Sequence, residues 1–328
     1  MTFLGSYNRL RALTREWPLF LIPVALCVLG ILTMHPFDAG SETLAPRQLT
    51  WLAVSVVAFL ICASLDMRFI RRTPVIVAGY VVTITLLILL LLVAPEVMGA
   101  KSWFTIGGFS FQPADLGKLA FIALMAKYFS RRHMAIGDFR HILLSGVYAA
   151  PVIVLLLLEP DLGTAVIFSA IWFGMVLVSG IPKKHLLIVG SVGLVLAAGL
   201  WFGGLHDYQR ARIMAFVNPA ADIRGSGYNA YQATIAAGSG ELWGKGIGYG
   251  TQSKLRFLPE YETDFIFAAY AEEWGFAGVV LVLVLYGILL SRLLSISRKA
   301  ATNFDAFFTL GVFLLFSAHL FIHAGINL

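Results

Sequence analysis

The chain has 328 residues, of which 59% are hydrophobic and 13% charged, with a net charge of +6 at pH 7 and a mean hydropathy of +0.83. Soluble domains carry roughly 25% charged residues, so this composition excludes an ordinary soluble protein and indicates several membrane spans. Short basic loops on one membrane face explain the positive charge, and no nucleic-acid partner is expected. The two cysteines, Cys27 and Cys62, lie in apolar runs without a CxxC pattern, which excludes a disulfide framework or zinc site.

Apolar runs along the chain predict an all-helical polytopic membrane protein. The first run, from Trp17 to Met34, follows a basic segment and is long, so we expect a retained helix rather than a cleaved signal peptide. Residues 1–328 are then one integral-membrane domain of about nine spans. The further spans are expected at 50–65, 74–94, 114–129, 142–158, 163–180, 185–203, 265–291 and 304–325.

Basic residues occur at every second connection between these spans, which places those connections and the N-terminus in the cytoplasm. They are the N-terminal segment, Arg68/Arg71/Arg72, Arg131/Arg132/Arg140, Lys183/Lys184 and Arg292/Arg298/Lys299. The remaining connections, 35–49, 95–113, 159–162 and 204–264, are then extracytoplasmic.

Two of these outer connections have unusual compositions. Residues 101–113 mix aromatic residues with glycine, as an interfacial segment does. The stretch 204–264 is far longer than a simple connection, which favours a folded and functional loop. Its glycine-dense part, 238–250, suits close backbone approach to a ligand or lipid. We expect the following residues of the loop to pack: Tyr208, Tyr228, Tyr231, Trp243, Phe257 and Leu258.

Asp264 is the strongest candidate for a catalytic residue. It stands where the polar loop ends and the apolar run Phe265-Ile266-Phe267 begins. Carboxylates at the edge of a membrane are costly to keep and are therefore functional candidates. Water on one side and a low-dielectric wall on the other suit a general base.

Three further groups of charged residues have both a structural and a functional interpretation. Asp161 is a natural N-cap of the helix that follows, while the shortness of the connection holds Glu159 and Asp161 near membrane level. Lys118 is either the partner of Asp115 in an i,i+3 ion pair or a cation facing an extracytoplasmic cavity. Arg210 and Arg212 are either salt-bridged loop residues or a clamp for pyrophosphate.

Four stretches of the chain resemble the SEDS family (shape, elongation, division and sporulation) of membrane glycosyltransferases. They are KSWFTIGGFSFQPADLGK, EPDLGTA, YQRARIMAFVNP and GSGELWGKGIGYGTQSKLRFLPEYETDFIFAAYAEEWGFAG, the last being long and specific. Within the family, the segment GTQSKLRFLPE is more similar to the RodA-like branch of the elongation machinery than to the FtsW branch of division.

The resemblance implies a peptidoglycan glycan-strand polymerase in the bacterial cytoplasmic (inner) membrane, with an active site on the outer side. Its aspartate in the TDFIFA motif falls on Asp264, which would be the base in an inverting transfer to the GlcNAc 4-hydroxyl of lipid II. Positive charge for the pyrophosphate leaving group would come from cationic side chains, with a divalent cation, Mg²⁺ or Mn²⁺, as an alternative source. We expect substrate binding by Lys118, Arg210, Arg212, Lys245 and Glu260, and cavity shaping or metal binding by Asp115, Glu159 and Asp161.

The resemblance also implies partners: lipid II and an undecaprenyl-pyrophosphate-linked glycan as substrates, membrane lipid, and other membrane proteins of the elongation complex. A class B penicillin-binding protein, a transpeptidase of the penicillin-binding-protein-2 type, is the expected protein partner.

The chain departs from the family pattern in three places. Asp115 stands where the family has glutamate, Ser102 stands where it commonly has arginine, and the sequence ends before the expected tenth span, which suggests a C-terminal truncation. Two alternatives remain open: a lipid II flippase, and a non-catalytic scaffold for the class B partner.

Overall fold

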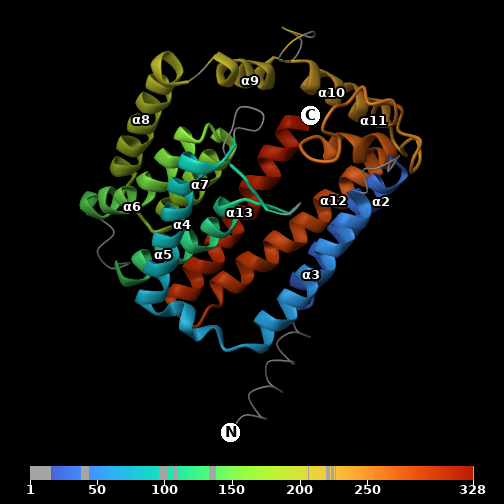
Figure 1. Ribbon diagram of the computed structural model, residues 1–328. Coiled ribbons are helices and arrows are strands. Elements are labelled where there is room, and N and C mark those ends of the chain that lie inside the picture. Colours follow the sequence, from blue (N-terminus) through green and yellow to red (C-terminus); the bar gives the residue numbers. More distant parts are fainter. Residues whose placement is uncertain are drawn as a thin grey trace. The chain divides into compact units, whose positions relative to one another are not determined.

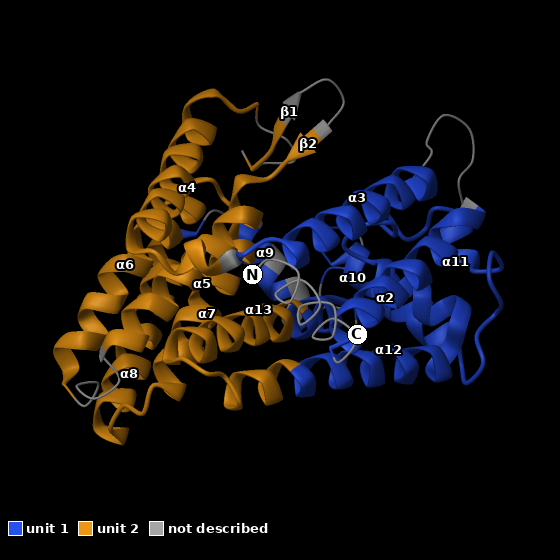
Figure 2. Cartoon of the chain, turned by 90° about the horizontal axis from the view of Figure 1, so that it is seen from below, with its two compact units in different colours: residues 1–66, 205–292, 320–328 blue, residues 67–204, 293–319 orange. Residues whose placement is uncertain are grey.

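A computed structural model describes residues 16–37, 44–95, 102–106, 109–132, 138–205, 207–218, 222, 225 and 227–327. Within these residues the regular secondary structure is helical apart from one short hairpin, and loops connect the elements (Figure 1). Its internal contacts divide it into two compact units (Figure 2). Unit 1 comprises residues 1–66, 205–292 and 320–328, and unit 2 comprises 67–204 and 293–319, so the last two helices contribute to both units.

Unit 1 is built from helices at both ends of the sequence. It contains α2 (Pro18–Met34), η1 (His35–Phe37), α3 (Leu44–Ser64), α9 (Asp207–Val217), α10 (Tyr228–Ser239), α11 (Thr251–Lys254), most of α12 (Ile266–Arg298) and the end of α13 (Asn303–Asn327). Helix α2 packs against α3, with the rings of Phe20 and Phe59 4.9 Å apart. Arg292 near the end of α12 binds both carboxylate oxygens of Glu16 at 2.7 and 2.8 Å, which ties α12 to the segment before α2.

Unit 2 is a bundle of helices from the middle of the sequence. It contains η2 (Met67–Arg71), α4 (Thr73–Val93), α5 (Pro113–Arg132), α6 (Phe139–Leu158), α7 (Leu162–Val178), α8 (Lys183–Gly199), the π-helical turn η3 (Leu200–Gly204) and the parts of α12 and α13 from 293 to 319. Helix α4 packs against α5, and α6 against α7. Fully buried Phe121 and Phe168, with ring centres 5.2 Å apart, join α5 to α7 in the core.

Helices occur at every position where the sequence predicts a span. Among the described residues, six are long and apolar enough to cross a membrane: α3, α4, α6, α8 with η3, α12 and α13. Helices α2 and α7 are apolar but shorter, at 17 residues each. Helix α5 is less apolar because Asp115, Lys118 and Lys127 lie along it. The predicted helix positions are therefore confirmed, and six of the helices meet the requirement for spanning on their own.

The short hairpin was not predicted. Strands β1 (Phe104–Ile106) and β2 (Phe109–Phe111) pair antiparallel, with Phe104 opposite Phe111, in the segment expected to lie at the interface. Two alternating runs of three residues separated by Gly-Gly are a sequence signal for a tight hairpin.

The stretch 204–264 is folded, since it contains α9, α10 and α11. Leu258 is fully buried, as expected, but Trp243 is 81% exposed and Phe257 48% exposed, so the expectation that these two aromatic residues pack is wrong. Beside Trp243 the chain meets α12 through its backbone: Phe276 and Ala277 donate their amides to the carbonyls of Glu241 and Leu242.

Candidate active site

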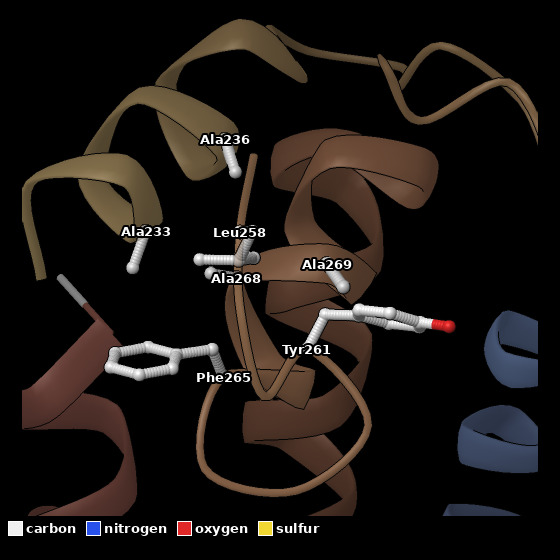
Figure 3. Close-up of a cluster of buried hydrophobic side chains, with 7 residues drawn as sticks. All are labelled: Ala233, Ala236, Leu258, Tyr261, Phe265, Ala268 and Ala269. Atoms are coloured by element: carbon white, nitrogen blue, oxygen red, sulfur yellow. The ribbon is translucent and has the colours of Figure 1, made fainter. Parts of the chain in front are cut away.

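A cluster of buried side chains anchors the segment that carries Asp264. It includes Leu258, Tyr261 and Phe265, which flank the aspartate in sequence, and the rings of Tyr261 and Phe265 extend to opposite sides of the segment (Figure 3). Alanines complete it from two helices, Ala233 and Ala236 on α10 and Ala268 and Ala269 on α12. Ile326 near the end of α13 packs against the same cluster. Because its neighbours are buried, the backbone at Asp264 is held firmly in place.

A tight turn at Glu260 sets the direction of this segment. Glu260 has a φ of 52°, a left-handed conformation that is uncommon for a residue other than glycine. Its carbonyl accepts the amides of Thr263 and Phe265 at 3.1 Å each, and its carboxylate accepts the Thr263 hydroxyl at 3.0 Å. Glu260, expected to bind substrate, therefore holds the turn that precedes Asp264.

The Asp264 side chain is exposed between buried Tyr261 and Phe265. Among the described residues its carboxylate has no hydrogen-bond or ion-pair partner, whereas its backbone carbonyl accepts a 2.9 Å bond from the amide of Asn327. A carboxylate with unused acceptor capacity, on a fixed backbone at the start of an apolar helix, is suited to take a proton from a bound hydroxyl.

Asn327 connects the end of α13 to the start of α12 and was not identified from the sequence. Its side chain is fully buried. Its Oδ1 accepts the amide of Ala268 at 2.9 Å, and its Nδ2 donates to the carbonyls of Asp264 and His323 at 2.9 and 2.8 Å. All hydrogens of the amide group are thereby used.

Lys245, expected to bind substrate, lies beside a buried carboxylate and neutralises it. Glu272 and Glu273 on α12 are 0% and 1% exposed. Oε1 of Glu272 accepts bonds from Lys245 Nζ at 2.7 Å, Thr251 Oγ1 at 3.1 Å and the Gln252 amide at 3.1 Å. The lysine thus serves the fold of the 244–252 loop, because a buried carboxylate without such partners is strongly unfavourable.

Gly244 and Gly275 allow this loop to lie against α12. Gly275 interrupts the helix with a φ of 65° and a ψ of −168°. A Cβ atom on it would overlap the backbone of Trp243 and Gly244, and one on Gly244 would overlap the carbonyl of Glu273. The loop amides of Lys245 and Gly246 donate to the carbonyls of Glu272 and Glu273 at 3.0 Å each, so the kink exchanges helical bonds for bonds to the loop.

In unit 2, both carboxylate oxygens of Asp161 in the Glu159-Pro160-Asp161 turn accept hydrogen bonds. Asp161 Oδ1 accepts the amide of Thr164 at 3.1 Å and caps α7, as the sequence predicts, while Oδ2 accepts Gln112 Nε2 at 3.0 Å. Glu159 is 1% exposed. Burial, with a smaller contribution from the negative charge of Asp161, raises the pKa of the Glu159 carboxyl to about 8. Glu159 is therefore largely protonated at neutral pH.

Lys118 is a buried cation with two partners in unit 2. Its Nζ lies 2.8 Å from Asp115 Oδ1, which confirms the predicted ion pair, and 3.4 Å from His319 Nε2. An ammonium only donates hydrogen bonds, so the facing His319 nitrogen is an acceptor. The Asp115 side chain is more than half exposed, whereas that of Lys118 is 8% exposed.

Arg210 on α9 has a partner in an ion pair, which was one of its two interpretations. Arg210 pairs with Asp207 at 3.4 Å, whereas the side chain of Arg212 lies outside the described residues. No group of three or more His, Cys, Asp or Glu side chains in the described part of the chain could hold a metal ion. Asp115, Glu159 and Asp161 are therefore not gathered into such a group.

Residues 17–328 match the family of FtsW, RodA and SpoVE, described as cell cycle proteins. The chain belongs to this family. It is 32% identical to the peptidoglycan glycosyltransferase MrdB of Escherichia coli K12 over 94% of this chain and 82% of MrdB. It is 38% identical to a probable peptidoglycan glycosyltransferase FtsW of Thiomicrospira cyclica over 76% of this chain and 64% of that protein. The resemblance to the SEDS family is confirmed.

Solved structures support the same fold. A chain of a peptidoglycan synthase complex that coordinates polymerization and crosslinking matches with a TM-score of 0.79 and 29% identity, over 95% of this chain and 87% of that chain. The rod shape determining protein RodA of Thermus thermophilus matches with a TM-score of 0.69 and 28% identity, over 95% and 84%. The chain is therefore an all-helical, multi-pass membrane protein with a RodA-like fold.

Proposed function

We propose that this chain is a peptidoglycan glycosyltransferase that polymerises lipid II, with Asp264 as its general base. The relatives MrdB and FtsW bear the name of this activity. The observation that carries the assignment of the base is the Asp264 carboxylate, which is exposed and, within the described residues, without a partner, on a backbone held by buried neighbours.

The reaction is a single displacement. The 4-hydroxyl oxygen of the acceptor GlcNAc attacks the anomeric carbon of the lipid-linked strand, and the bond from that carbon to the pyrophosphate oxygen breaks. The electron pair leaves with undecaprenyl pyrophosphate, and Asp264 takes the hydroxyl proton. An α-linked donor gives a β-linked product, and a positioned base contributes about 10²–10⁴-fold.

The leaving pyrophosphate requires positive charge. Lys118 is our candidate for this role because it is a buried cation, and its ion-pair partner Asp115 is exposed. Arg212 remains a candidate on its sequence position alone. Lys245, Glu260 and Arg210 have partners within the fold, so we propose them as supports of the site rather than as substrate ligands.

We further propose that the N-terminus is cytoplasmic and that Asp264 and the long loop 204–264 are extracytoplasmic. The alternation of basic connections supports this orientation. A membrane-impermeant thiol reagent should label Thr263→Cys in intact cells and Lys183→Cys only after permeabilisation, in a Cys27→Ala/Cys62→Ala background. The reverse pattern would overturn the orientation.

A role in cell elongation, with a class B penicillin-binding protein as partner, is the finer proposal. The match to MrdB extends over 94% of this chain and that to the Thiomicrospira FtsW over 76%, and one solved relative belongs to a synthase complex. Expression should restore rod shape in cells depleted of MrdB and should not restore division in cells depleted of FtsW. Rescue of division alone would reverse the assignment.

The activity is tested with purified lipid II and the reconstituted chain, with and without a class B partner. Glycan polymer is expected from the wild type and none from Asp264→Asn. Glu262→Gln is the control: it makes the same acid-to-amide change two residues away and should still give polymer. Equal polymer from Asp264→Asn would remove Asp264 as the base. If the wild type and Asp264→Asn both support crosslinking by the partner but neither makes polymer, the scaffold is favoured. Translocation of lipid II without polymer would favour the flippase.

A further inference from the structure

The start of α12 requires a hydrogen-bond acceptor that its own sequence does not supply. The first amides of a helix have no partner within it and are usually bound by an Ser, Thr, Asp or Asn at the N-cap. The carbonyl of Phe265 accepts the first helical bond, from Ala269, so Phe265 occupies the N-cap position. Its ring is buried in the apolar cluster and offers no acceptor.

Asn327 supplies the missing acceptor from 59 residues away. Its Oδ1 binds the amide of Ala268, three residues after the N-cap, at 2.9 Å. This is the amide that an N-cap side chain normally binds. Asp264 is the carboxylate nearest in sequence, one residue before the N-cap, and among the described residues it is not bound to this amide.

The same side chain also fixes the backbone of Asp264. Asn327 Nδ2 donates one hydrogen to the Asp264 carbonyl at 2.9 Å and the other to the His323 carbonyl at 2.8 Å. The amide orientation is determined by these partners, because turning it over would set its NH₂ against the Ala268 N–H and its oxygen against two carbonyls. An asparagine satisfies all three groups, and a fully buried site makes each loss costly.

We propose that Asn327 is a positioning residue for Asp264: it caps α12 in place of the aspartate and clamps the aspartate backbone, which leaves the carboxylate free for proton transfer. This inference rests on the proposed function of Asp264 as the base. The titratable residues close to Asp264 in sequence are Glu260, Tyr261 and Glu262. His323 lies one helical turn before Asn327, which binds the backbone carbonyls of both His323 and Asp264.

The test compares Asn327→Leu with Thr33→Val in the full chain, assayed on purified lipid II with its class B partner. Thr33 is a matched control in unit 1: it is buried, and its Oγ1 accepts a 3.2 Å bond from Trp274 on α12, away from Asp264. Asn327→Leu should lower kcat by about 10–100-fold with little change in KM, because misplacement of the base affects the chemical step. Thr33→Val should keep kcat within about 3-fold, because it removes a bond that does not touch the base.

The pH profile separates positioning from simple loss of structure. In Asn327→Leu the unbound helix amides become available to the Asp264 carboxylate and favour its charged form, so the acidic limb of kcat should move to lower pH. Asp264→Glu assigns that limb to residue 264 by displacing it. An Asn327→Leu chain with an unmoved limb and a kcat no lower than that of Thr33→Val would overturn the proposal.

Hydrogen exchange separates this proposal from the proposed function. Exchange at the Ala268 amide should be about 10-fold faster in Asn327→Leu and unchanged in Thr33→Val, whether or not the wild type polymerises lipid II. An inactive wild type with a faster Ala268 amide in Asn327→Leu would reject the glycosyltransferase and support the clamp. An unchanged Ala268 amide would overturn the clamp.

Discussion

Two aspartates precede helices in this protein, and they are used differently. Asp161 stands at the N-cap of α7. One of its carboxylate oxygens accepts a hydrogen bond from the Thr164 amide, and the other accepts one from Gln112. Asp264 precedes α12, but the corresponding amide, that of Ala268, is bound by Asn327, and the Asp264 carboxylate has no partner among the described residues. An aspartate ahead of a helix is therefore structural in one case and free of partners among the described residues in the other. Asp161 is itself the N-cap, whereas Asp264 lies one residue before the N-cap of α12 and a residue distant in sequence binds the amide.

The largest difference between the two aspartates should appear when the charge of each is removed. Asp264→Asn should reduce polymerisation by about 10²–10⁴-fold, because the amide cannot accept the proton. Asp161→Asn should leave the rate within a few-fold, because asparagine caps a helix about as well as aspartate. Initial rates of glycan formation from lipid II measure both, and comparable losses in the two variants would contradict the distinction.

The anchoring of Asp264 can be tested through its neighbour. Phe265→Ala should lower the free energy of unfolding by about 3–5 kcal/mol, because it empties a position in a buried cluster shared by α10 and α12. Thermal unfolding in detergent measures the loss. Phe257→Ala, at an exposed aromatic residue in the same loop, is the control and should change the midpoint little. A Phe265→Ala chain as stable as that control would show that the cluster does not anchor the segment.

The turn at Asp161 should give the protein a pH-dependent stability. The pKa of Glu159 is raised from 4.5 to about 8, so the folded chain binds more protons than the unfolded chain between these values. Stability is therefore greatest below about pH 4.5 for this group and falls as pH rises toward 8. Glu159→Gln should flatten this dependence in thermal unfolding measured from pH 5 to pH 8. An unaltered slope would show that Glu159 ionises normally.

The smallest effect is expected from removing the Asp161 side chain that caps α7. Asp161→Ala should lower the free energy of unfolding by about 0.5–2 kcal/mol, through loss of the bond to the Thr164 amide. Asp161→Asn restores that acceptor and should recover most of the loss. If Asp161→Ala instead abolished polymerisation at unchanged stability, Asp161 would belong with Asp264 in the chemistry.

Local signals in the sequence predicted much of this structure. Long apolar runs gave the helix positions, the Asp161 cap followed from its place ahead of α7, and the spacing of Asp115 and Lys118 predicted their ion pair. What could not be predicted depends on partners distant in sequence. Lys245 meets Glu272 27 residues later, and Asn327 meets Asp264 across 63 residues. Trp243 was expected to pack, but its side chain is exposed and the backbone carbonyls of the two preceding residues make the contact with α12.

The backbone contact between Gly244 and Gly275 has a consequence for large-scale mutagenesis. No side chain fits at either position, since a Cβ atom would overlap the facing main chain. In a saturation library selected for growth, both glycines should therefore be as depleted of substitutions as Asp264, although neither carries a group that could transfer a proton. Measuring the amount of folded protein in the membrane for each variant would distinguish the two groups. The glycine variants should be lost from the membrane, whereas the Asp264 variants should be present at full abundance but inactive.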